Sequence, residues 1–89
     1  MKTKEFLINA TKLAEGDRQQ DYGDKVKNHK NISQLWSAYL DMPITTHDVA
    51  VMMCLLKIAR TKLGKVSKDT YIDMAAYSAI AGEIKFKEG

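Results

Sequence analysis

Hydrophobic residues recur along this chain at the three- and four-residue spacing of amphipathic helices. In residues 4–15 apolar side chains stand at positions 6, 7, 10, 13 and 14 in helical spacing, and Gly16 is placed to end a helix. Residues 25–40 show the same spacing, weakly in their first two turns and strongly in their last two. The pattern predicts two helices joined by a polar loop at 16–24, which holds two glycines and three aspartates.

The second half of the chain predicts two more helices. Pro43 cannot extend the preceding helix, and Thr45 and Asp48 stand at the spacing of a capping box. The third helix, 47–63, is apolar almost all round in its first half, as expected of the central helix of a small bundle or of a helix shared with a partner subunit. A fourth helix at 68–84 carries small residues on its apolar side. We therefore expect an all-α fold, one compact bundle of about four helices over residues 1–89.

Composition and charge narrow the class of protein. The chain has 89 residues, 45% hydrophobic and 28% charged, which is typical of a small globular domain with little stability to spare, so a homodimer or higher homo-oligomer is a natural supplement. The 14 basic residues are interleaved with 11 acidic ones, and no helix carries a basic stripe, which argues against nucleic acid as a partner and against a DNA-binding regulator. No segment has the continuous apolar core of a signal peptide or a membrane span, so we expect a cytoplasmic protein.

The turn between the third and fourth helices gathers opposite charges. Lys57 and Arg60 precede it, and Asp69 and Asp73 follow it, with Tyr77 one turn further on. In an antiparallel hairpin these groups meet, and a salt bridge that clamps the two helices explains them without a function. The alternative is the floor of a pocket for an anionic ligand such as a nucleotide phosphate. Asp69 and Asp73 could also hold a hydrated Mg²⁺, although two carboxylates alone are a weak metal signal.

The polar loop offers a second candidate. Arg18, Tyr22 and Gly23 stand just before a helix N-terminus, where an arginine, an aromatic ring and backbone N–H groups can receive a phosphate and a base. A purely conformational Tyr-Gly turn explains the same residues equally well. His29 and His47 lack partners at metal-ligand spacing, so we expect both on the surface. The single cysteine, Cys54, lies in an apolar run and is expected to be buried and inert, and no catalytic residue can be assigned.

These residues follow an ordered pattern: Arg, three residues, Tyr-Gly, a later Asn, Leu-Trp-x-x-Tyr-Leu, Asp-Val-x-x-Met-Met-x-Leu-Leu-Lys-x-x-Arg, and Asp-x-x-x-Asp-x-Ala-x-Tyr. The pattern covers about residues 18–84 and resembles a family of small phage and prophage proteins of unknown function. The resemblance implies a phage accessory protein in the host cytoplasm. The "LLKIAR" to "DMAAY" hairpin is also similar in outline to one in T7-type phage nucleotide kinases, and the helical plan to MazG-like pyrophosphohydrolases, but the Glu-x-x-Glu pair of the latter is missing.

Two functions follow as hypotheses. In the first, the protein binds a nucleotide or another phosphorylated small molecule, with or without Mg²⁺, and whether it is an enzyme stays open. The candidate ligand-binding residues are Arg18, Tyr22, Gly23, Asn31, Lys57, Arg60, Asp69, Asp73 and Tyr77. In the second, it is a protein-interaction module that binds a host factor through the apolar third helix and the Trp36 region.

Overall fold

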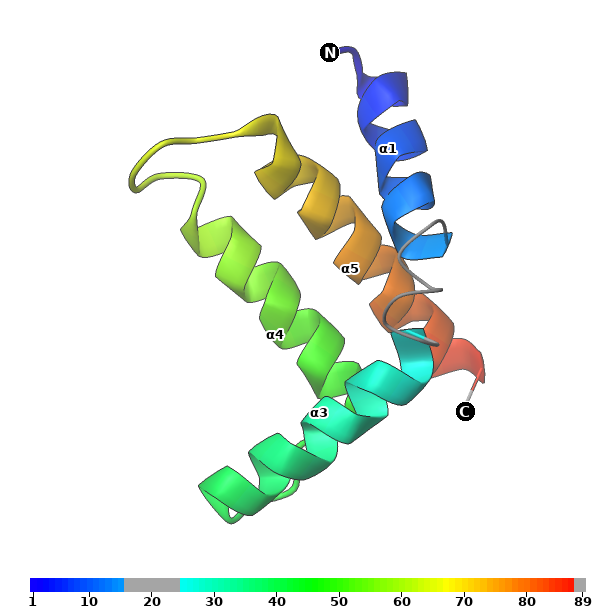
Figure 1. Cartoon of the computed structure of the whole chain (residues 1–89), viewed down its shortest axis with the longest axis vertical. Helices are drawn as coiled ribbons and strands as arrows, with labels where there is room; N and C mark the ends of the chain where they lie inside the picture. The colour runs from blue at the N-terminus through cyan, green and yellow to red at the C-terminus, as the bar shows by residue number, and fades with distance from the viewer. Residues whose placement is uncertain (16–24, 88–89) are drawn as a thin grey trace.

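The computed structural model describes residues 1–15 and 25–87, and this part of the chain contains four helices and no strand (Figure 1). The helices are α1 (Thr3–Glu15), α3 (Lys25–Leu40), α4 (Thr46–Ala59) and α5 (Lys68–Lys87). The predicted all-α bundle is confirmed. The predicted polar loop at 16–24 lies outside the described residues.

The last helix, α5, is the centre of the bundle. It packs against each of the other three helices: α4 runs antiparallel along one side, α1 lies on the other, and α3 crosses near its C-terminal half (Figure 1). The central position therefore belongs to α5 and not to the apolar third helix, and the alternative that the third helix is shared with a partner subunit stays a prediction. Small residues at 75, 76, 79 and 81 let neighbouring helices approach α5 from two sides, whereas α4 is packed on one face only.

The hydrophobic core lies where the four helices meet. Ala50 of α4 packs with three residues of α5, namely Ile80, Ala81 and Ile84, and each of these four is at most 7% exposed. Ala14 of α1, Val26 of α3 and Tyr77 of α5 pack against this cluster and are partly buried. Every described helix thus contributes to one core.

A serine fixes the turn between α3 and α4. Asp41 has a positive φ of 53°, and the N–H of Met42 donates to the Ser37 carbonyl at 3.2 Å, which is the bond that closes a Schellman motif. The Ser37 hydroxyl accepts from the N–H of Ile44 at 2.8 Å and donates to the Ser33 carbonyl at 2.6 Å. The segment around Pro43 is therefore tied back onto the last turn of α3.

The start of α4 is the predicted capping box. The Thr45 hydroxyl accepts from the Asp48 N–H, and the Asp48 carboxylate accepts from the Thr45 N–H, both at 2.9 Å. The predicted end at residue 63 is wrong, because α4 stops at Ala59. The N–H groups of Arg60 and Thr61 donate three residues back, which tightens and ends the helix, and Gly64 with a φ of 75° then turns the chain.

Candidate functional site

An ion pair joins α4 and α5 on their facing sides. Lys57 Nζ lies 3.1 Å from Asp73 Oδ2, and the two side chains are only 13% and 25% exposed. The antiparallel packing of the helices brings the end of α4 to the start of α5, as the hairpin prediction required. The predicted salt bridge with Lys57 is therefore present, and it is largely shielded from water.

A histidine and a tyrosine continue this line of polar groups toward the core. Tyr77 follows Asp73 by one helical turn, and its ring lies 6.0 Å from that of His29 on α3, at an angle of 54°. We refer to Lys57, Asp73, Tyr77 and His29 as the polar seam. It combines groups from three helices, α3, α4 and α5.

His29 was expected on the surface, and that expectation is wrong. Its side chain is 5% exposed, because it lies on the same face of α3 as Val26 and Ser33 and points toward the other helices. Nδ1 lies 2.7 Å from the Lys25 carbonyl, and Nε2 is buried with no hydrogen-bond partner among the described residues. The sequence contains the signal for this placement, since Val26, His29, Ser33 and Trp36 recur at three- and four-residue spacing.

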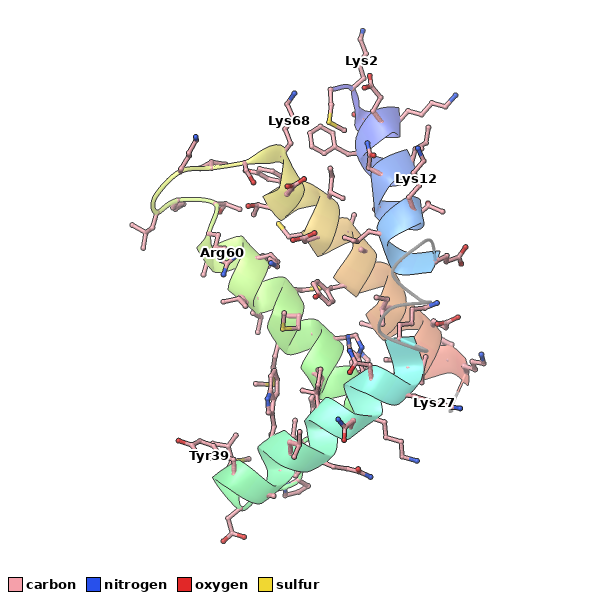
Figure 2. The ribbon with its side chains drawn as sticks, in the orientation of Figure 1. Lys2, Lys12, Lys27, Tyr39, Arg60 and Lys68 are labelled. Carbon is pink, nitrogen blue, oxygen red and sulfur yellow. The ribbon has the colours of Figure 1, made fainter. Side chains whose placement is uncertain are left out.

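The far end of the hairpin holds two further charged side chains of the predicted cluster, those of Arg60 and Asp69. Arg60 caps the C-terminus of α4 with an exposed side chain, which Figure 2 shows at the free end of that helix. Asp69 is exposed in the first turn of α5. Within residues 1–15 and 25–87, neither takes part in a salt bridge. The structure thus places one pair of the predicted cluster in contact and leaves the other pair open to solvent.

The other predicted site residues lie elsewhere. Asn31 is exposed, and since it stands two residues after His29 it points to the opposite side of α3. Arg18, Tyr22 and Gly23 lie outside the described residues. Six of the nine candidate ligand-binding residues thus lie in the described part of the chain, and three of these, Lys57, Asp73 and Tyr77, belong to the polar seam.

The described residues hold no cluster of metal ligands, and Cys54 favours its neutral thiol. No group of three or more His, Cys, Asp or Glu side chains that could hold a metal ion occurs among the described residues. Asp73 is committed to Lys57, which leaves Asp69 as the open carboxylate of the predicted Mg²⁺ pair. Cys54 is half-buried, its thiol donates to the Met74 carbonyl at 3.8 Å, and burial raises its pKa, so the neutral thiol is favoured over the reactive thiolate.

Comparison with known proteins places the chain in a family. Residues 5–85 match a family described as a domain of unknown function, DUF6378. The chain belongs to this family. The DUF6378 domain is 42% identical over 84 residues to the Gene 55 protein of Mycobacterium phage L5 and 38% identical over 82 residues to that of Mycobacterium phage D29.

These relatives are longer than the DUF6378 chain. The two alignments cover 93% and 92% of the chain and 54% of each relative, so the chain spans about half of their length. The predicted kinship with phage proteins of unknown function is confirmed. No solved structure matches, and the comparisons give no support to the likeness with T7-type kinases or MazG-like enzymes. None of the helices in the described part of the DUF6378 domain has the length and apolarity to cross a membrane.

Proposed function

We propose that this phage-family domain binds a phosphorylated small molecule, and that a nucleoside phosphate is the class that fits best. The observation that carries the proposal is Nε2 of His29, which has no partner in the described part of the chain and is buried beside Tyr77 at the inner end of the polar seam. A buried polar atom without a partner costs free energy, and such atoms concentrate where a ligand, water or reaction supplies the missing contact.

The hydrogen bond at Nδ1 of His29 determines whether Nε2 is a hydrogen-bond donor or an acceptor. Nδ1 faces the Lys25 carbonyl at 2.7 Å, which has no proton to give, so Nδ1 carries the hydrogen. In the neutral imidazole, Nε2 is then an acceptor. A ligand that completes the site must bring a donor, such as a hydroxyl or amino group, as sugars and bases do.

The open end of the hairpin offers the complementary chemistry. The Arg60 guanidinium can bind a phosphate through two parallel hydrogen bonds, and the Asp69 carboxylate can accept from ligand hydroxyl groups. Asp69 and Tyr77 are eight residues apart on α5, about 12 Å at 1.5 Å per residue. A bare phosphate cannot bridge that length, whereas an extended nucleoside phosphate can. The proposal concerns binding, because Lys57 and Asp73 already neutralise each other.

A thermal-shift series tests the proposal. Nucleoside mono-, di- and triphosphates, with inorganic phosphate as the reference anion, are titrated with and without Mg²⁺, and we expect one class to raise the Tm. Arg60→Ala should abolish that shift, whereas Lys65→Ala, which removes an exposed cation from the adjacent turn, should retain it. His29→Phe should lose the shift while the folded state stays intact. A shift from no nucleotide, or an equal shift in Arg60→Ala, would refute the proposal.

One further observation favours a second candidate function. The side of α4 that faces away from α5 exposes large apolar side chains. Such a surface suits a protein-interaction module, and a host protein is one partner that it could bind. This candidate predicts complex formation that is indifferent to Arg60→Ala and sensitive to substitutions on α4, so the two functions separate in one set of variants.

A further inference from the structure

The side of α4 opposite its packed face is apolar and open to solvent. We call Val51, Met52, Leu55, Leu56 and Ile58 the outer face of α4; each is between 36% and 57% exposed. Val51, Leu55 and Ile58 stand at four- and three-residue spacing and so form one stripe along the helix. The opposite side holds Ala50, which is fully buried.

Helix α3, which packs against α4, also exposes large apolar side chains. Leu35 is 61% and Tyr39 is 88% exposed, and Figure 2 shows Tyr39 and Arg60 at the two ends of the side that α4 forms away from α5. Soluble monomers rarely expose contiguous apolar patches beyond a few hundred Å², and each partner of a stable complex buries about 800 Å². Seven large apolar side chains on two adjoining helices suit an interface of that kind.

We infer that a second copy of this chain covers the outer face, with the two α4 helices packed antiparallel about a twofold axis at Leu55. A twofold interface uses the same patch on both subunits, so the patch must complement itself. Leu55 meets this condition as a centre, since Asp48 lies in the first turn of α4, seven residues before it, and Lys62 lies in the turn that follows α4, seven residues after it.

The charges at the two ends of the stripe complement each other in this arrangement. Antiparallel packing brings Asp48, in the first turn of α4, toward the exposed Lys62 of the partner subunit in the turn after its α4, and the same contact recurs on the other side of the axis. Asp48 accepts from the Thr45 N–H through Oδ2, and a carboxylate has acceptor capacity beyond its bonds with Thr45. The two helix dipoles also oppose each other favourably. A second copy of the chain requires a central residue with opposite charges on its two sides. Binding of an unrelated protein does not require this arrangement.

Measurement of mass in solution tests the inference. By sedimentation equilibrium over a range of concentrations we expect the protein to be a dimer at micromolar concentration. Leu55→Lys should raise the dimer Kd about 100-fold, because the substituted residue meets its own symmetry mate. Leu7→Lys on α1 is the matched control, since Leu7 is also 57% exposed, and it should leave the Kd within about threefold. Circular dichroism checks that both variants keep their helices.

A cross-link tests the position of the axis. In a Cys54→Ala background, Leu55→Cys should form an intermolecular disulfide with oxidised glutathione, which accepts the two electrons and leaves as two glutathione thiols. Ser78→Cys, exposed on α5, should not cross-link. A wild-type monomer would overturn the inference and leave the face to another protein. A dimer that survives Leu55→Lys and resists the Leu55→Cys cross-link would overturn it too.

Discussion

The two faces of α4 differ in a way that is unusual for a soluble monomer. The face packed on α5 includes the charged Lys57, held by Asp73, whereas the solvent-facing side carries Val51, Leu55 and Ile58. A monomer gains stability from the reverse distribution, with charge in water and large apolar groups inside. The inner face therefore suits a ligand-binding site, where a charge shielded from water can contribute to binding. The outer face suits an interface with a second protein chain.

The largest expected effect is the loss of unfolding free energy when a core side chain, and not one of the outer face of α4, is truncated. Ile84 lies in the core at 2% exposure, and Ile84→Ala should lower the free energy of unfolding by about 3 kcal/mol. Leu55→Ala removes a side chain of similar size that is 57% exposed, and it should cost less than about 0.5 kcal/mol in dilute protein, below the dimer Kd. Urea denaturation at low concentration measures both. Equal losses at that concentration would mean that the outer face is covered within a single chain.

The inner face is tested by the ion pair of the polar seam. Asp73→Ala leaves Lys57, which is 13% exposed, without its partner, and should cost about 2 kcal/mol of unfolding free energy. The double variant Lys57→Met with Asp73→Leu removes both charges, and it should be within about 1 kcal/mol of the natural protein. A double-mutant cycle on urea unfolding gives the coupling. If Asp73→Ala costs less than about 0.5 kcal/mol, the pair behaves as a surface salt bridge and the seam is not a shielded site.

Local sequence patterns predicted the parts of this fold that depend on neighbouring residues in the chain. The Thr45 and Asp48 capping box, the helical periodicities and the hairpin that joins Lys57 to Asp73 all arise within one turn or across one short connection. The glycine at 64 marks the turn correctly, but α4 ends earlier, because the hydrogen bonds of Arg60 and Thr61 tighten the helix after Ala59.

The rest of the arrangement depends on contacts between distant segments. Which helix is central is decided by the small residues of α5, which admit neighbours on two sides, and not by the more apolar α4. His29 is buried because α3 crosses near the end of α5, a placement that a local charge pattern rich in lysines obscures. The exposure of the Arg60 and Asp69 side chains to solvent likewise depends on side-chain geometry, which the spacing of residues in the sequence does not determine.

The smallest expected effect concerns the start of α4, where both faces begin. Thr45→Ala removes the hydroxyl that accepts from the Asp48 N–H and should cost about 1 kcal/mol of unfolding free energy. The hydrogen bond from the Thr45 N–H, followed by that from the Thr45 side chain, lowers the pKa of Asp48 below its ordinary value. The stabilising contribution of this carboxylate is therefore present above the unfolded pKa, near 4, and is lost as the pH falls through the lower folded pKa. Asp48→Asn keeps an acceptor without the titration, so its stability should fall less steeply below pH 4 than that of the natural protein. Urea titrations at pH 5, 4, 3 and 2 compare the two, and parallel curves would show that the cap does not hold Asp48 in its charged form.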